Sequence, residues 1–245
     1  MSDLADALWQ ARLGGPVVDI PTSLTLSEAY AIAARNHARR LARGDRAAGR
    51  KIGHTWPATW AAQGIAAPTW GWLYADTTDD LADALDLAAW REPKVELELV
   101  LRLGMDRRPD AMALGLEIVD RPYPSWDFPV AASVSAGGVH AALLHGPWQP
   151  FDPQADLSTL RACLRVGEQY SEGGSERVLG SPLRALEALA DLLDEQEALP
   201  LQPDEIVTTG ALTPALPLKP GQRCEARIEG LPGSLLAPLA FTTSA

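Results

Sequence analysis

Cysteine, positive charge and long apolar runs are all scarce in this chain of 245 residues. Its two cysteines, Cys163 and Cys224, do not form a Cys-x-x-Cys pair and are too few to build a disulfide framework. Lysine and arginine total 21 against 32 acidic residues, and the formal net charge of −11 disfavours nonspecific binding to nucleic acids and to anionic membranes. No apolar run approaches the roughly 20 residues that cross a bilayer, and the N-terminus lacks a signal-peptide pattern. We therefore expect a soluble, cytoplasmic protein that binds neither nucleic acid nor membranes.

The common local motifs of catalysis are also missing. The sequence has no P-loop, no dinucleotide-binding glycine fingerprint, no Gly-x-Ser-x-Gly elbow and no His-Glu-x-x-His. The four histidines are not spaced as zinc ligands, so each is expected to be a surface or packed residue. They are His37, His54, His140 and His145.

Helices are predicted near the N-terminus and once in the C-terminal half. Apolar residues recur at helical spacing in residues 2–13, 27–43 and 182–196, and Ser27 is a candidate N-cap of the second helix. The arginines between Arg35 and Arg46 alternate with alanine and leucine, which predicts a solvated helix face. Residues 79–90 are compatible with either a helix or a loop.

From Gly49 onward, short apolar runs broken by glycine and proline predict strands and turns. Helices come first, then mostly strands, one helix and strands again, without the alternation of a doubly wound sheet. We therefore predict an α+β fold with a mixed, mainly antiparallel β core. No interdomain linker is evident, which predicts one domain over residues 1–245, with a helical part (1–46) and a β-rich core (47–245).

Three acidic residues stand out on the predicted strands. Glu96 and Glu98 are two positions apart in KVELELVL, so both carboxylates point to the same face of a strand. This alternation is also typical of any half-exposed strand. Glu117 interrupts the apolar run MALGLEIV and is expected to be at least partly buried, where it needs a hydrogen-bonding cation such as one of the arginines, a metal ion or a proton.

Carboxylates from two strands, without histidine or cysteine, would form an oxygen-only site. Such ligands suit hard divalent cations such as Mg²⁺ or Mn²⁺. Lys51, between glycines in GRKIGHT, is by its local sequence a surface lysine at a turn into a strand.

Seven segments in order carry a resemblance to one family, and they span most of the chain. They are SLTLSEAY, GRKIGHT, TWGWLYAD, VELELVL, LGLEIVDRPYPSW, VGEQYSEGGSERVLGSPLRALEALADLL and DEIVTTGALTPALPLKPGQRCEARIEGLPGSLL. They resemble the 2-keto-4-pentenoate hydratases, which belong to the fumarylacetoacetate hydrolase superfamily together with the 4-oxalocrotonate decarboxylases. The resemblance implies a fumarylacetoacetate hydrolase-like β roll with an N-terminal helical region and flanking helices.

The resemblance also implies the residues of the site. It assigns Glu96, Glu98 and Glu117 as ligands of Mg²⁺ or Mn²⁺, Lys51 as the active-site lysine, and Asp76 as the acid that works beside that lysine.

Three further residues are placed near the substrate by the resemblance: Ser135, Thr209 and Gly210. The sequence departs from the family where Asp-Asn-x-Ser is common, because residues 132–135 read Ala-Ser-Val-Ser. It also has Ala75 where the family usually has another acid before the position of Asp76.

The implied reaction is the addition of water to a small anionic 2-hydroxy-2,4-dienoate, giving a 4-hydroxy-2-oxo acid in the meta-cleavage catabolism of aromatic compounds. The metal would chelate the carboxylate and the 2-oxygen of the substrate. Two alternatives stay open: a metal-dependent decarboxylase of 4-oxalocrotonate-type 2-oxo acids, and a non-catalytic homologue that acts as a partner subunit. Because the family is usually oligomeric, a homo-oligomer is implied.

Overall fold

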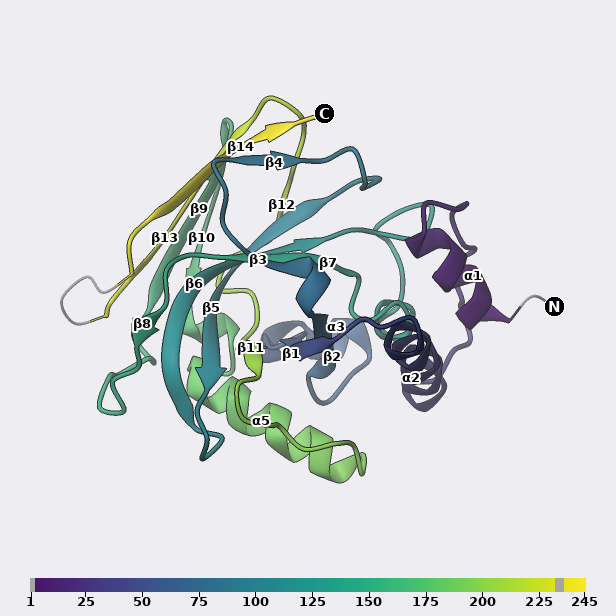
Figure 1. Ribbon diagram of the computed structural model, residues 1–245, viewed down its shortest axis with the longest axis horizontal. Helices are drawn as coiled ribbons and strands as arrows, with labels where there is room; N and C mark the ends of the chain where they lie inside the picture. The colour runs from purple at the N-terminus through teal and green to yellow at the C-terminus, as the bar shows by residue number, and fades with distance from the viewer. Residues whose placement is uncertain (1–2, 232–235) are drawn as a thin grey trace.

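Residues 3–231 and 236–245, which the computed structural model describes, form two β-sheets with helices at their margins (Figure 1). The larger sheet contains β1 (Ala47–Gly53), β2 (Thr69–Tyr74), β3 (Thr78–Asp80), β5 (Lys94–Leu103), β6 (Pro109–Val119), β7 (His140–His145), β8 (Gln149–Pro150), β11 (Ile206–Thr208) and β12 (Leu216–Pro217). The second sheet contains β4 (Ala84–Asp86), β9 (Arg161–Val166), β10 (Gln169–Gly174), β13 (Arg223–Glu229) and β14 (Leu239–Ser244). The helices are α1 (Leu4–Arg12), α2 (Leu26–Ala42), α3 (Trp60–Gln63), α4 (Val130–Ser135) and α5 (Pro182–Glu195), with 3₁₀ turns η1 (Pro57–Thr59), η2 (Ala75–Thr77) and η3 (Ser175–Arg177).

Most strand pairs are antiparallel. The larger sheet has the order β2-β1-β11-β5-β6-β7-β3, with β12 beside β5 and β8 beside β6, and the second has the order β10-β9-β13-β14-β4. In the described part of the chain, the parallel pairs are β1 with β11, β3 with β7 and β4 with β14. The expected α+β fold with a mixed, mainly antiparallel core is confirmed. The last of the seven segments crosses residues 232–235, which lie outside the described residues.

The long hairpin of β5 and β6 positions the three acidic residues. Its register pairs Glu96 with Glu117 and Glu98 with Gly115. Directly paired residues have their side chains on the same face of a sheet, and residues two apart on a strand share a face. All three carboxylates therefore lie on one face of the larger sheet.

The opposite face of this hairpin packs against the second sheet and forms the main apolar core. Leu97 and Leu99 of β5 share this core with Leu164 of β9 and Phe241 of β14, and all four are buried. Truncating a buried leucine costs about 2–5 kcal/mol. This packing therefore stabilises β5 and β6, whose opposite face carries the three carboxylates.

Helix α5 covers the adjoining part of the same sheet face. Ser181 caps its N-terminus, and Pro182 occupies the first turn. Its buried Leu189 and Leu193 pack with Ile52 of β1 and with other apolar residues of the sheet. The helix predicted over residues 182–196 is confirmed.

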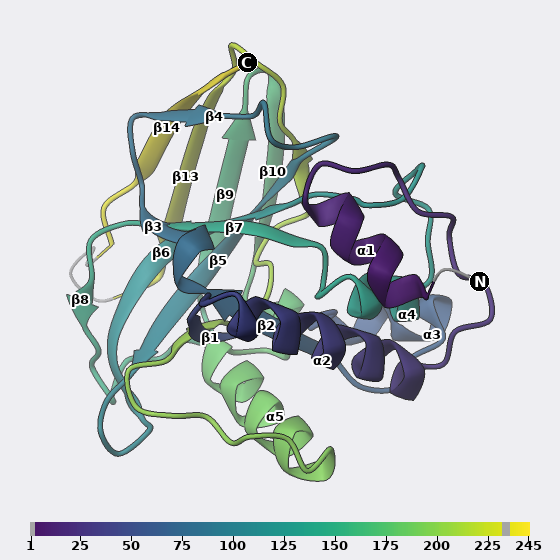
Figure 2. The same ribbon diagram turned by 45° about the vertical axis from the view of Figure 1, so that its right-hand side comes forward.

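Helices α1 and α2 lie at the side of the molecule away from the second sheet (Figure 2). They confirm the helices predicted over residues 2–13 and 27–43, although residue 2 lies outside the described residues. The N-cap of α2 is Thr25 and not Ser27, because Thr25 and Glu28 form a reciprocal capping box. No helix in the described residues is long and apolar enough to cross a membrane.

Two expectations for charged segments are corrected by the structure. Arg40 does not lie on a solvated face: it is 2% exposed, its Nε lies 2.7 Å from Asp45, and its guanidinium packs over the Tyr74 ring. Residues 79–90 contain the end of β3 and all of β4, which pair with β7 and β14. Tertiary pairing of these short edge strands decides their conformation.

Candidate metal centre

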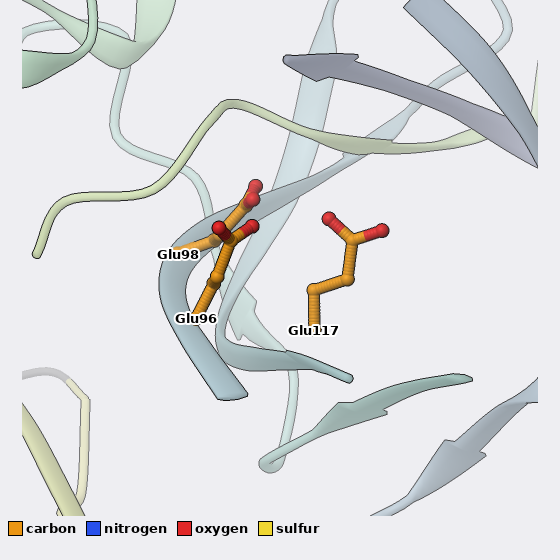
Figure 3. Close-up of side chains that lie close together, drawn as sticks. All are labelled: Glu96, Glu98 and Glu117. Carbon is orange, nitrogen blue, oxygen red and sulfur yellow. The ribbon is translucent and has the colours of Figure 1, made fainter. Parts of the chain in front are cut away.

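The carboxylates of Glu96, Glu98 and Glu117 meet on the free face of the β5–β6 hairpin. One oxygen atom from each lies within 4.8 Å of the other two. Figure 3 shows the two side chains of β5 across from the single side chain of β6. Glu117 and Glu98 are buried, at 0% and 1% exposure, whereas Glu96 is half-buried.

Glu117 is anchored through one of its two oxygens. Its Oε1 atom accepts a hydrogen bond from Lys51 Nζ at 2.6 Å and lies 2.9 Å from His140 Nδ1. The other oxygen, Oε2, is buried and has no hydrogen-bond partner in the part of the chain that the structure describes. Because an unpaired buried carboxylate oxygen is costly, this atom fits a metal ligand.

Glu98 is held in a similar way from the other side. Its Oε2 atom accepts a hydrogen bond from the backbone N–H of Gly210 at 2.8 Å. Gly210 has a φ of +99°, and a Cβ there would lie 2.3 Å from the Thr55 hydroxyl oxygen, so only glycine fits. Thr209 uses its hydroxyl on the Leu99 carbonyl at 2.8 Å. Thr209 and Gly210 thus fix β5 and one of its carboxylates.

Lys51 is buried, at 5% exposure, and the surface position that its local sequence predicted is wrong. Its ammonium group donates to Glu117 and also to the Gly138 carbonyl at 3.1 Å. The backbone at Gly138 lies close to the Lys51 side chain: a Cβ there would be 3.2 Å from it. Glycine fits this position, which also has a φ of +70°. Burial was anticipated for Glu117, but its partners are a lysine and a histidine and not an arginine.

The cluster contains more negative than positive charge. Burial and the neighbouring carboxylates raise the pKa of Glu96 to about 7 and raise the pKa of Glu98 well above its ordinary value. Burial alone would also raise the pKa of Glu117, but Lys51 and His140 lower it to about 2. Burial alone would lower the pKa of Lys51, yet Glu117 and Glu96 raise it. A divalent cation among the three carboxylates would remove this imbalance.

The described contacts of Asp76 are with arginines and not with Lys51. It pairs with Arg40, and its carboxylate lies 3.8 Å from Arg43. Its side chain is 47% exposed. The 3₁₀ turn η2 places it beyond the end of β2, next to helix α2.

Ser135 is also occupied by contacts of its own. Its hydroxyl donates to the Ala132 carbonyl at 2.9 Å and lies 3.1 Å from the Tyr123 hydroxyl. It is 1% exposed, at the end of α4. The structure therefore brings together Lys51 and the three glutamates. Ser135 instead contacts Tyr123 and the backbone of α4.

His140 also belongs to the cluster, although its local sequence predicts only a surface or packed residue. It lies on β7 beside Glu117, and its Nε2 atom is 3.1 Å from the Thr77 hydroxyl. No local signal distinguishes it from the other histidines, because its importance comes from the pairing of β7 with β6.

A cavity of about 660 Å³ lies between the N-terminal helices and β2. Its wall includes Trp72, Tyr74 and His140, but neither Lys51 nor any of the three glutamates. His140 therefore lies in the wall of this cavity and also contacts Glu117 of the carboxylate cluster.

Curated relatives match almost the whole chain, although no protein-family model matches it. The 2-keto-4-pentenoate hydratase of Paraburkholderia xenovorans (strain LB400) is 31% identical over 247 residues, covering 94% of this chain and 91% of that enzyme. A 4-oxalocrotonate decarboxylase of a Pseudomonas species is 30% identical over 251 residues, covering 96% of each chain.

A solved structure matches the fold. It is the 4-oxalocrotonate decarboxylase from Pseudomonas putida G7 complexed with magnesium and adipate, with a TM-score of 0.87 and 23% identity, covering 98% of this chain and 95% of that one. The fold and the resemblance carried by the seven segments are thereby confirmed. The chain belongs to the 2-keto-4-pentenoate hydratase/4-oxalocrotonate decarboxylase family within the fumarylacetoacetate hydrolase superfamily.

Proposed function

We propose that this protein is a divalent-metal-dependent hydratase. It would add water to a 2-hydroxy-2,4-dienoate of the 2-keto-4-pentenoate type and release a 4-hydroxy-2-oxo acid, in the meta-cleavage catabolism of aromatic compounds. One observation carries the proposal: Oε1 of Glu117 is fixed by Lys51 and His140, while Oε2 is buried and unpaired beside two further carboxylates. This arrangement is organised for an added cation.

In this proposal Glu96, Glu98 and Glu117 hold Mg²⁺ or Mn²⁺, the hard cations that carboxylate oxygens suit. The relative solved with magnesium and adipate supports this choice. When bound, the cation supplies Lewis-acid polarisation of a substrate held through its carboxylate and 2-oxygen.

Lys51 would act as a proton donor or as a hydrogen-bond donor to the substrate. Two of its three N–H groups are used, on Glu117 and on the Gly138 carbonyl, and the third remains for a ligand. The surrounding carboxylates raise the pKa of Lys51, so it enters the reaction as an ammonium group. This form can deliver a proton during tautomerisation of the dienol.

The remaining predicted residues receive supporting roles. Thr209 and Gly210 would act by fixing β5 and Glu98 beside the substrate. Asp76 and Ser135 stay predicted site residues, with described contacts to Arg40 and to Tyr123 respectively. We further propose that residues 1–245 act as one catalytic domain within a homo-oligomer.

The test follows the ultraviolet absorbance of 2-hydroxypenta-2,4-dienoate with Mg²⁺ or Mn²⁺, alongside CO₂ release from 4-oxalocrotonate. We expect loss of the dienol signal that depends on added metal. The variant Lys51→Met should lower turnover by about 100- to 10,000-fold, whereas Lys219→Met, at an exposed lysine, should be unchanged.

Each alternative has its own outcome. CO₂ release without hydration would identify a decarboxylase. Metal binding without either signal would favour a non-catalytic partner subunit. Near-normal turnover of Lys51→Met would contradict the assignment of Lys51.

A further inference from the structure

The short strand β11 lies between β1 and β5 in the larger sheet (Figure 1). Its last residue, Thr208, is paired with Lys51 of β1 on one side and with Val100 of β5 on the other. Directly paired residues have their side chains on the same face of a sheet, so Thr208 faces the same side as Lys51. Val100 is two positions from Glu98 and shares its face. Thr208 therefore lies on the face that carries the metal centre, between the strand of the lysine and the strand of two of the carboxylates.

The hydroxyl group of Thr208 is buried and lacks a partner. The residue is 0% exposed, and its Oγ1 atom forms no hydrogen bond with any group in residues 3–231 and 236–245. The hydroxyl of the next residue, Thr209, donates to the Leu99 carbonyl at 2.8 Å. A buried hydroxyl without a hydrogen bond destabilises a folded protein, so the Thr208 hydroxyl indicates a ligand that bonds it.

Thr208 lies at the inner end of the metal centre. Glu96, near the start of β5, is half-buried, whereas Val100, farther along the same strand, is 0% exposed. Val100 packs with Leu73 and Leu143, which are also 0% exposed. These apolar side chains offer the Thr208 hydroxyl no hydrogen bond, so its ligand has to lie on the side of the carboxylates. A position this deeply buried suits a ligand as small as a water molecule.

The polar groups of the neighbouring strands can complete a site for water. A buried water molecule typically forms about two to four hydrogen bonds. The Thr208 hydroxyl can donate one and accept others. Lys51 uses two of its three N–H groups on described partners, and Glu98 uses its Oε2 atom on the Gly210 N–H. One N–H of Lys51 and the second oxygen of Glu98 are therefore further candidates to bond the water.

We propose that the hydroxyl of Thr208 holds the water molecule that is added to the substrate. This inference rests on the proposed function, because hydration consumes water and decarboxylation does not. In the addition step the water oxygen bonds to carbon 4 of the 2-oxo-3-enoate, and the proton that the water loses ends on carbon 3. One O–H bond and one π bond break while one C–O bond and one C–H bond form, so no other reactant is needed. Thr208 orients the water oxygen toward carbon 4 and is not consumed.

The experiment separates tautomerisation of the dienol from the addition of water. Wild-type protein and Thr208→Val are compared by proton NMR in D₂O, with 2-hydroxypenta-2,4-dienoate and saturating Mg²⁺. Tautomerisation places deuterium on the terminal carbon, whereas 4-hydroxy-2-oxopentanoate forms only after water has been added. Valine replaces the hydroxyl by a methyl group of similar size. We expect it to slow formation of the hydroxy acid about 10- to 100-fold and to change deuterium incorporation by less than about twofold.

Two further measurements distinguish the hydroxyl from the shape of the side chain. Thr208→Ser keeps the hydroxyl and should restore most of the hydration rate. The melting temperature of metal-free Thr208→Val should equal or exceed that of wild-type protein, because the substitution breaks no hydrogen bond among the described residues. A clear fall in that temperature would assign the hydroxyl to support of the fold and overturn the inference.

Other outcomes also overturn it. An unchanged hydration rate in Thr208→Val would show that the hydroxyl does not hold the water. Equal slowing of deuterium incorporation and of hydration would place Thr208 at the tautomerisation step instead. A Thr208→Ser protein as slow as Thr208→Val would assign the loss to the lost methyl contacts. Failure of wild-type protein to form 4-hydroxy-2-oxopentanoate would contradict the proposed function itself, and this inference with it.

Discussion

Arg50 and Lys51 are neighbours in the sequence, yet they belong to two buried charge clusters on opposite faces of β1. Arg50 is 0% exposed, and its guanidinium carbon lies 3.3 Å from the centre of the Trp72 ring. One of its guanidinium nitrogens pairs with Glu205 Oε1 at 2.6 Å. One cation therefore meets one anion on that face. On the other face Lys51 meets three carboxylates, and the cluster keeps a surplus of negative charge.

The difference separates a structural cluster from a functional one. A buried ion pair of equal charges is complete once the chain has folded. A buried cluster with surplus charge of one sign is complete only when something else binds, or when protons are taken up. The raised pKa values of Glu96 and Glu98 show that, without a bound cation, these carboxylates tend to take up protons.

The largest expected effect comes from breaking the balanced cluster. Arg50→Met should lower the free energy of unfolding by about 3–5 kcal/mol, because it leaves the half-buried Glu205 carboxylate without its cation. Affinity for Mg²⁺ should not change, since Lys51 lies on the other face. Urea denaturation and a Mg²⁺ titration measure the two quantities. The double variant Arg50→Met/Glu205→Gln should recover most of the stability, and a large loss of Mg²⁺ affinity in Arg50→Met would mean that the two faces are not independent.

A second prediction concerns pH and the surplus charge. The pKa of Glu96 is about 7 in the folded protein and 4.5 ordinarily, so without metal this residue lowers stability as pH rises from about 4.5 to 7. Under the proposed function Mg²⁺ would bind the charged carboxylates of the folded state and oppose this loss, by about 2.7 kcal/mol at 100 times its Kd. The increase in melting temperature caused by Mg²⁺ should therefore grow between pH 5 and pH 7.5.

Melting curves at several pH values, with and without MgCl₂, check this. Residues that do not contact the metal centre affect both curves equally and cancel in the difference. An equal Mg²⁺ effect at pH 5 and pH 7.5 would contradict the assignment of surplus charge to the three glutamates. In Glu96→Gln the pH dependence of the Mg²⁺ effect should become weaker.

The smallest effect is expected at His140, which contacts Glu117 but is not one of the three proposed metal ligands. His140→Leu should weaken Mg²⁺ binding by about 10- to 100-fold, as is usual when a partner of a metal ligand is removed. His145→Leu on the same strand is the matched control, because the Nδ1 atom of His145 is 2.9 Å from the Gly146 carbonyl. Calorimetric Mg²⁺ titrations compare the two. Equal losses in both variants would assign the effect to β7 packing and not to the contact with Glu117.

Much of the fold follows from local patterns. Helical spacing located α2 and α5, and the alternation around Glu96 and Glu98 placed both carboxylates on one face of a strand. Local patterns failed for β3 and β4, since such short edge strands exist through their neighbours. The same limit applies to Arg40, whose position depends on acidic partners and on an aromatic ring that distant segments supply.

The sequence by itself determined the class of fold and the burial of Glu117, because periodicity and an acid within an apolar run are local properties. The family followed from the resemblance carried by seven segments of the chain. Only the tertiary structure decided that Glu117 lies opposite Glu96 and that Lys51 and His140 share one of its oxygens. The physical reason is that a strand's own sequence selects the face of each side chain, whereas the register and the neighbours of that strand are set by contacts far along the chain.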